Sequence, residues 1–366
     1  MKPLYDVIIV GGGPAGCATA IALHNLGVNN TLVIEGSDYT APRIGESIPP
    51  NSRELFEKLG IWSAFSAQKH APCLGSYSSW GSDKLGFNDY LFNPQGNGWH
   101  LNRSAFDKFL AMQVEKLGGA LLKNTHFANL SQEQHPYPIK VTLRNKAQIR
   151  CRFIVDATGR SAKVARQFNA KVRVEDQLVA VSGYFEADDI IAKESYQQMT
   201  LLEAVDYGWW YLAHLPNNKV IVTVASDAAV IKQKQLKSTD AWQHAMHLTQ
   251  HISPIIAQAP PSNLHTWIAQ SAIMDPPAAQ CWLTVGDSAS SFDPISSQGI
   301  YKALNNGIEA ATAIKAWLDN NAQEINQYRN AIGHSFINYL EQKAFFYNQE
   351  QRWPDSEFWQ KRQGPP

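Results

Sequence analysis

The sequence predicts an α/β fold in which a domain built on a parallel sheet is interrupted by an inserted, antiparallel β-rich domain. From residue 5 to residue 34 the chain reads as a strand, a glycine-rich turn, a helix and a second strand. Between about 177 and 266, alternating segments rich in aromatic residues are typical of antiparallel strands. A buried strand at 282–285 and a long helix at 299–318 then return the chain to the first domain.

The other elements follow in chain order. Helices are expected at 52–59 and 104–117, the second with Ser104 as its N-cap. The expected strands are 120–122, 153–156, 179–185, 209–215 and 219–225. Short strands and loops fill 72–99, and apolar residues recur at helical spacing from 330 onward. We expect the first domain at 1–75, 100–170 and 275–325, the β-rich domain at 76–99 and 171–274, and a helical, aromatic tail at 326–366.

Composition excludes several classes of partner. The 366 residues contain 32 Lys and Arg and 32 Asp and Glu, so the net charge is +0 and no basic surface for nucleic acid or anionic membranes is expected. Charged residues make up 17%, below the usual value of about 25%, and aromatic residues reach 11% with 11 tryptophans. This balance favours an apolar cleft or a protein interface.

Cysteine usage and hydropathy predict a cytoplasmic protein without metal. Cys17, Cys73, Cys151 and Cys281 are scattered, with neither a CxxC pair nor the spacing of zinc ligands. The absence of a run of about 18 apolar residues predicts no membrane span. Asp6 and the glycines that follow it argue against a signal peptide.

A G-x-G-x-x-G motif directly follows the first strand, which predicts a Rossmann-like dinucleotide site. Gly11 permits the tight turn, Gly13 lets backbone amides approach a pyrophosphate, and Gly16 lets the helix pack closely on the strand. Pro14 and Ala15 complete the turn. Glu35, at the end of the second strand, supplies a carboxylate for ribose hydroxyls and disfavours a 2′-phosphate.

A second nucleotide element distinguishes FAD from NAD. Gly286-Asp287 and the segment from Asp293 to Gly299 resemble the FAD-dependent monooxygenase and halogenase superfamily, as do the segments at 43–47, 102–107 and 156–160. The resemblance implies a non-covalent FAD, with Asp287 on the ribityl chain and amides of 294–299 on the flavin. The resemblance, or for Phe127 its position on a strand, implies further residues that contact FAD. These are Arg43, Glu46, Ser47, Arg103, Phe127, Pro294, Ser297, Gln298 and Gly299. Phe127 would contact adenine through its backbone. For Asp156 and Arg160, stabilising a turn is as good an explanation as a part in FAD binding.

Two features indicate which subgroup of this superfamily the sequence resembles. The W-x-W-x-I-P motif and the lysine four residues before a tryptophan that mark tryptophan halogenases are absent, since Ser76 lies four residues before Trp80. Gly208-Trp209-Trp210-Tyr211 and the aromatic tail Arg352–Arg362 resemble instead the LodB/GoxB-like flavoproteins. Those proteins mature amino-acid oxidases whose cysteine tryptophylquinone is built from their own side chains.

The resemblance implies oxygen transfer from O2 to an aromatic ring, with NAD(P)H or another reductant as the electron source. Trp80, Trp209, Trp210, Tyr211 and Tyr77 are candidates to line the substrate pocket, and ordinary core packing is the alternative for each. His214 or His100 could act as a base, although a histidine satisfied within the structure is the alternative. No Ser/His/Asp pattern, paired carboxylates or metal-ligand spacing stands out.

Three functions therefore remain open. The first is a monooxygenase acting on a tryptophan side chain of a partner oxidase precursor, with Trp209, Trp210 and the C-terminal aromatic segment forming the rim of its pocket. The second is a small-molecule aromatic hydroxylase, a halogenase or a geranylgeranyl-reductase-like enzyme. The third is a non-catalytic, flavin-bound maturation partner.

Overall fold

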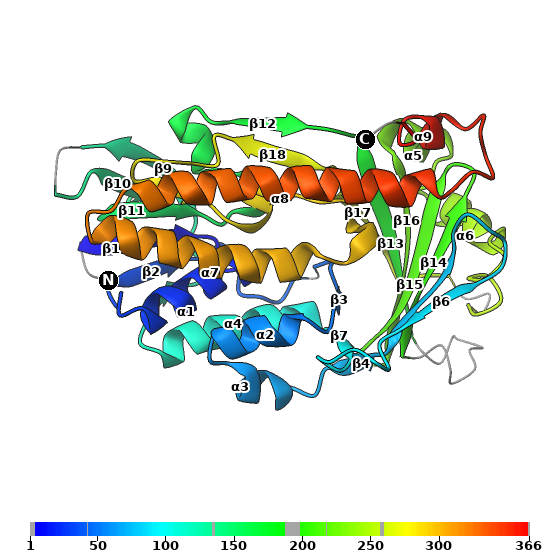
Figure 1. Cartoon of the computed structure of the whole chain (residues 1–366), viewed down its shortest axis with the longest axis horizontal. Coiled ribbons are helices and arrows are strands. Elements are labelled where there is room, and N and C mark those ends of the chain that lie inside the picture. The colour runs from blue at the N-terminus through cyan, green and yellow to red at the C-terminus, as the bar shows by residue number, and fades with distance from the viewer. Residues whose placement is uncertain are drawn as a thin grey trace.

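The computed structural model describes residues 4–41, 43–133, 136–186, 198–216, 218–256 and 260–364. The predicted α/β class is confirmed: a mostly parallel sheet and its helices occupy one end of the molecule, and an antiparallel sheet occupies the other (Figure 1). The helices are α1 (Pro14–Asn25), α2 (Ser52–Lys58), α3 (Trp62–Ser66), α4 (Arg103–Lys116), α5 (Ala228–Gln233), α6 (Thr239–His247), α7 (Gly299–Leu318), α8 (Gln323–Asn348) and α9 (Glu357–Gln360).

The first sheet carries the nucleotide motif. Its strands, in spatial order, are β19 (Ala278–Ala279), β20 (Trp282–Thr284), β11 (Gln148–Asp156), β1 (Leu4–Val10), β2 (Thr31–Ile34) and β8 (Ala120–Leu122). The strands from β20 to β8 are parallel. An antiparallel extension of β11 is made by β10 (Ile139–Leu143) and β9 (Phe127–Gln132). The apolar run in β1 is central to this sheet, which explains why it is apolar on both faces.

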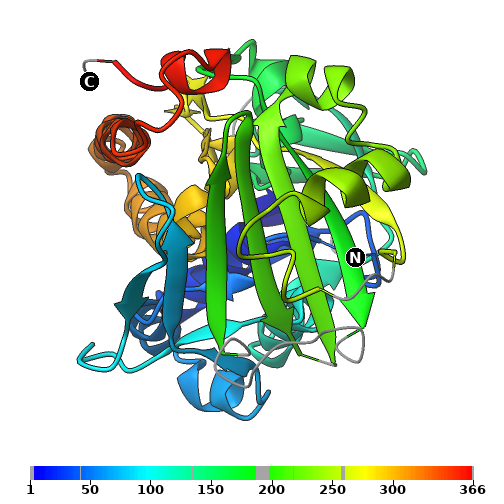
Figure 2. The ribbon, with the colours of Figure 1, turned by 90° about the vertical axis from the view of Figure 1, so that its right-hand side faces the viewer.

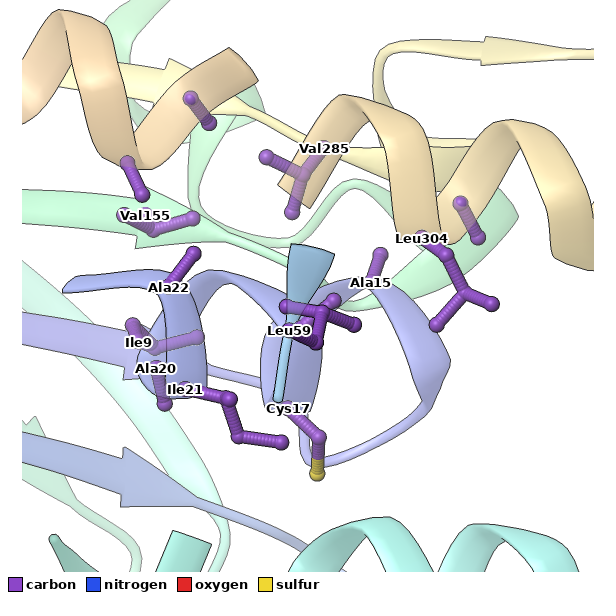
Figure 3. Close-up of a cluster of buried hydrophobic side chains, with 14 of the residues drawn as sticks. Ile9, Ala15, Cys17, Ala20, Ile21, Ala22, Leu59, Val155, Val285 and Leu304 are labelled. Atoms are coloured by element: carbon purple, nitrogen blue, oxygen red, sulfur yellow. The ribbon is translucent and has the colours of Figure 1, made fainter. Parts of the chain in front are cut away.

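The two faces of β1 belong to different cores. Val7 and Ile9 pack with α1, α4, α7 and α8, whereas Ile8 and Val10 pack with β9, β10 and the turn after β11. Figure 3 shows part of the first core, where Ile9, Val155 and Val285 meet side chains of α1 and α7. This packing fixes the start of α1 against the carboxyl edge of the sheet.

The second sheet is the β-rich part and faces the viewer in Figure 2. Its strands, in spatial order, are β17 (Leu264–Ile268), β13 (Leu178–Glu186), β16 (Lys219–Asp227), β15 (Gly208–Leu215), β14 (Met199–Val205), β5 (Gly75–Ser79) and β6 (Gly86–Asp89). All pairs are antiparallel except β14 with β5. Helices α5 and α6 cover one face of this sheet, around Trp210 and Trp242.

Two small sheets join the larger ones. The strands of the first are β12 (Lys171–Val174), β18 (Ala272–Asp275) and β21 (Ser290–Ser291). Those of the second are β3 (Ser47–Ile48), β7 (Gly98–His100) and β4 (Ala71–Cys73). The second of these sheets places Ser47 opposite His100.

One sequence prediction about the helices was wrong, and another is extended by the structure. Ser104 does not cap α4, because Asn102 occupies the N-cap and its side chain accepts a hydrogen bond from the Ala105 amide at 3.1 Å. The helical spacing expected from 330 onward lies within α8, which begins earlier, at Gln323, and runs without a break to Asn348. In Figure 1, α8 extends along the molecule from the first sheet towards the second.

The C-terminal aromatic segment forms core and not the rim of a pocket, which corrects the sequence prediction. Phe358 and Trp359 are buried beside Trp209 and Tyr347. The indole nitrogen of Trp359 donates to the Val205 carbonyl at 2.9 Å. The tail is therefore part of the second sheet's packing.

Candidate active site

A cavity of about 680 Å³ lies between the carboxyl edge of the first sheet and one face of the second. Its wall combines segments that are far apart in the sequence, as expected for a ligand bound at a domain junction. Sequence-predicted cofactor residues that line it are Gly11, Gly13, Pro14, Ala15, Glu35, Arg43, Glu46, Ser47, Arg103, Phe127, Asp287, Pro294, Ser297 and Gly299. Gly16 and Gln298 do not line it. Gly16 packs against Gly11 and Ala157, and Gln298 is the N-cap of α7.

The three motif glycines meet different surroundings. Gly11 has a φ of +110°, and a Cβ there would lie 2.1 Å from the Ala157 carbonyl oxygen. A Cβ on Gly16 would lie 1.9 Å from the Gly11 carbonyl oxygen. A Cβ on Gly13 would have the Arg43 guanidinium, at 3.7 Å, as its nearest neighbour and would project into the cavity. The first two glycines are thus needed by the fold, and the third leaves room for a ligand at the positive N-terminus of α1.

Glu35 presents a fixed carboxylate beside this turn. It accepts hydrogen bonds from the Gly12 amide at 2.7 Å and from the amide and hydroxyl of Ser37 at 2.8 and 2.6 Å. The guanidinium of Arg43 lies 3.5 Å away and also contacts the buried Asp107 at 3.3 Å. Asp107, to which no role was assigned from the sequence, holds Arg103 as well, at 3.2 Å.

Glu46 places a buried carboxyl group in the cavity wall. Its Oε2 accepts from the Gly45 amide at 3.0 Å, whereas Oε1 is buried without a protein partner. Burial raises the pKa of Glu46 to about 7, and the nearby Arg103 guanidinium only partly opposes this. An unsatisfied oxygen at this place fits a site whose remaining polar partner is a ligand.

The buried Glu46 predicts a specific pH dependence of stability. A pKa raised from 4.5 to about 7 means that the unfolded state ionises first, so stability falls as pH rises between these values. We expect Glu46→Gln to remove this loss and to stabilise the protein by about 3 kcal/mol above pH 7, with no advantage at pH 4. Urea denaturation at several pH values measures the difference, and a constant difference across this range would contradict the assignment.

Ser47, the residue after Glu46, is connected by hydrogen bonds to His100 and to Tyr211 of the second sheet. The Ser47 hydroxyl lies 2.7 Å from the Tyr211 hydroxyl and 2.9 Å from Nδ1 of His100. His100 is fully buried, and burial lowers its pKa to about 4, so its imidazole is neutral near pH 7. His100 does not line the cavity.

Asp287 and Arg160 form the next part of the wall. The ammonium group of Lys302, a buried residue of α7, lies 3.1 Å from Asp287, and the Arg160 guanidinium lies at 3.6 Å. Lys302 and Arg160 both hold the pKa of Asp287 below its usual value, against the effect of burial. Sequence reasoning missed Lys302, although its position one turn into the predicted helix after the 294–299 turn was a usable signal.

Asp156 takes the turn-stabilising role, since it accepts from amides of Thr158, Val164 and Ala165.

The second sheet provides an aromatic wall, but only part of the predicted set reaches it. Trp209 and Tyr211 line the cavity, whereas Trp210 points to the opposite face of β15, because side chains alternate along a strand. His214 shares the parity of Trp210 and also lies outside the lining. Tyr77 packs against the core around Trp210, and Trp80 packs on Tyr347 and Trp359, so neither reaches the cavity.

The part of the cavity wall that the second sheet forms carries no charged side chain among its described residues, unlike the rest of the cavity. The second sheet contributes Ala180, Ser182, Leu202, Trp209, Tyr211, Ile221 and Thr223. Of the described residues that line the cavity, Lys163 is the one lysine, and it belongs to the segment after β11 of the first sheet. Across the described part of the chain, no group of three His, Cys, Asp or Glu side chains could hold a metal ion.

These features define a dinucleotide-binding protein of the α/β class, with a cavity lined by the glycine turn, the 294–299 turn and the second sheet. Gly13 and the unpartnered Glu46 oxygen fit FAD, because Gly13 admits a pyrophosphate and the Glu46 oxygen offers a further polar contact in the cavity wall. The chain belongs to the FAD-binding domain family, whose model matches residues 4–331. It is an FAD-dependent oxidoreductase.

Curated relatives fall in two groups. LodB of Marinomonas mediterranea, which carries the name of an FAD-dependent oxidoreductase, is 28% identical over 98% of this chain and 96% of its own. A tryptophan 2-halogenase of Chondromyces crocatus is 26% identical over 85% of this chain, which spans 61% of that protein.

Solved structures share the fold. The myxobacterial chondrochloren halogenase CndH superposes with a TM-score of 0.89 at 20% identity, over 100% of this chain and 87% of that one. The peptidyl tryptophan dihydroxylase QhpG, described as essential for tryptophylquinone cofactor biogenesis, superposes with a TM-score of 0.78 at 21% identity, over 100% and 80%. In the described residues no helix has the length and apolarity needed to cross a membrane.

Proposed function

We propose that this protein is a cytoplasmic monooxygenase that oxygenates a tryptophan side chain in the precursor of a quinone-cofactor amino-acid oxidase. The observation that carries the proposal is the wall of the second sheet, where Trp209 and Tyr211 face the cavity among apolar and hydroxyl side chains. Such a wall suits stacking of an indole ring, which needs apolar contact and few hydrogen bonds. The full-length similarity to LodB and the fold shared with QhpG support the same substrate class.

The residues of the first domain would hold FAD along its length. Gly13 and the N-terminus of α1 would bind the pyrophosphate, Glu35 the adenine-side ribose, and Asp287 the ribityl chain. Bound FAD, reduced by NAD(P)H or another donor, would supply the reaction of O2 with the aromatic ring. The chain's own part is to orient the ring on the Trp209 wall and to exclude water from it.

Halogenation is the second candidate, because several relatives are named as halogenases, flavin-dependent halogenases among them. The wall of the second sheet argues against it. Among the described residues of that wall there is no lysine, and hydroxyl groups are the polar groups present. Without an ammonium group there, a halogenating species would lack a positioned donor next to the substrate.

Coexpression with a candidate oxidase precursor tests the proposal directly. We expect intact-mass and peptide mass spectrometry to show added oxygen on a precursor tryptophan when this protein is present. The matched control is Gly13→Val, which should fold but lack FAD, and should leave the precursor unmodified. Added halogen would favour the second candidate, and a complex whose precursor stays unmodified would favour a non-catalytic maturation partner.

A further inference from the structure

The hydroxyl of Tyr347, near the end of α8, joins two walls of the cavity. The indole nitrogen of Trp209 donates to this hydroxyl at 3.0 Å, and the hydroxyl donates to Oδ2 of Asp293 at 2.7 Å. Trp209 belongs to the aromatic wall of the second sheet, and Asp293 begins the turn that leads to Gly299. Tyr347 itself does not line the cavity. One phenol outside the cavity therefore connects the wall for the substrate with the wall for the cofactor.

Helix α8 holds Asp293 from a single face. Tyr339, Lys343 and Tyr347 are spaced by four residues, so their side chains lie one above another on the helix. The Asp293 amide donates to the Tyr339 hydroxyl at 2.7 Å. Burial raises the pKa of Asp293, and the charge of Lys343 only partly opposes this. The other carboxylate oxygen of Asp293 accepts from the Ile295 amide at 3.0 Å, within the turn. The position of the turn thus depends on α8.

The ring of Tyr347 is held in place by the C-terminal segment, residues 349–364. Its ring centroid lies 5.8 Å from that of Trp359 and 6.2 Å from that of Phe358. The guanidinium of Arg362 stacks on Phe358 at 3.8 Å and lies 5.6 Å from the Tyr347 ring. A ring packed in this way cannot follow a displaced indole, so its hydroxyl is a fixed point for Trp209.

Loss of the Tyr347 hydroxyl would alter the shape of the cavity wall while leaving the fold in place. Trp209 is 2% exposed, and the Tyr347 hydroxyl is the partner that satisfies its indole N–H. A buried N–H that loses its partner carries a free-energy penalty, which a rotation of the indole towards polar groups or water can relieve. Because Trp209 lines the cavity, such a rotation would alter the surface on which an aromatic substrate rests.

We propose that Tyr347 is a positioning residue that fixes the Trp209 indole relative to the flavin-binding turn and thereby determines how aromatic substrates bind. The nature of the substrate rests on the proposed function, whereas the coupling between Trp209 and the turn does not. Tyr347 acts on aromatic ligands through Trp209, so removal of its hydroxyl should weaken their binding only while the indole is present.

A double-mutant cycle on the FAD-loaded protein tests the effect on binding. The probe is N-acetyltryptophanamide, with its dissociation constant measured by calorimetry. We expect Tyr347→Phe to weaken binding five- to tenfold when both proteins are saturated with FAD, and to have less than a twofold effect in a Trp209→Phe background. The control is Tyr328→Phe, which removes a buried hydroxyl from the same helix that donates to the Thr284 carbonyl at 2.7 Å, outside the cavity lining. Equal binding by Tyr347→Phe and the unsubstituted protein overturns the proposal.

Hydrogen exchange tests the coupling without a substrate. We expect Tyr347→Phe to accelerate exchange at least tenfold both at the Trp209 indole N–H and at amides of residues 295–299, whereas Tyr328→Phe leaves both unchanged. Unchanged exchange at either place overturns the proposal. If N-acetyltryptophanamide fails to bind the unsubstituted protein, the aromatic substrate class is contradicted, and the exchange result alone decides the role of Tyr347.

Discussion

Gly13→Val is expected to abolish FAD retention and to leave the fold intact. Gly13 has a φ of −75° and a ψ of −172°, an extended conformation that valine adopts readily. The nearest atom to an added Cβ is 3.7 Å away, so the protein itself accommodates the side chain. The branched methyl groups would occupy the space in which a pyrophosphate approaches the backbone amides of the turn. We expect affinity for FAD to fall at least about a hundredfold, or roughly 2.7 kcal/mol.

The measurement is the flavin content of the purified protein, with circular dichroism to show that it is folded. Gly333→Val is the matched control, because an added Cβ there meets nothing within 4 Å and the residue lies on α8, away from the cavity. Gly11→Val and Gly16→Val should instead yield misfolded protein, since each Cβ would collide with backbone atoms at about 2 Å. A yellow Gly13→Val protein with normal FAD content would refute the assignment of this turn.

The elements that local pattern determines were predictable from the sequence. The strand, glycine turn and helix at the N-terminus are specified by residues within one short segment, and α7 matches its expected range from Gly299 to Leu318. Where two neighbouring residues could fill one role, the pattern could not choose between them. Asn102 and Ser104 are both good N-caps, and Asn102 occupies the cap.

The composition of the site was less predictable, because its walls come from distant segments. Alternation along 208–215 shows that Trp209 and Trp210 face opposite sides, but it does not show which side meets the cavity. Tyr347 and Lys302 reach the site through hydrogen bonds whose partners are 138 and 15 residues away, and neither resembles a motif. Long-range partners of this kind follow from the packing of α7 and α8 and not from local sequence.

The C-terminal aromatic residues illustrate the same difficulty, since an aromatic-rich tail fits both a docking rim and a buried core. Trp80, Tyr347, Trp353 and Phe358 surround Trp359, with ring centroids between 5.2 and 5.9 Å from it. The tail is also tied to the turn after β5, where Arg352 contacts Asp83 at 2.7 Å and Glu350 accepts from the Gly81 amide. Removal of this segment would expose Trp209 and the core around it.

Trp359→Ala should therefore lower the free energy of unfolding by about 3 to 5 kcal/mol, the usual cost of removing a fully buried aromatic side chain. The loss combines an unfilled cavity with the hydrogen bond that the indole now donates to the Val205 carbonyl at 2.9 Å. Urea denaturation measures it, and the control is Trp353→Ala, whose half-buried ring stacks on Trp359 from the outside and should cost about 1 kcal/mol. If the tail were a docking rim, Trp359→Ala would weaken precursor binding at unchanged stability. If Trp359 is instead a buried support for the Trp209 wall, Trp359→Ala must lose stability and release FAD at a lower temperature.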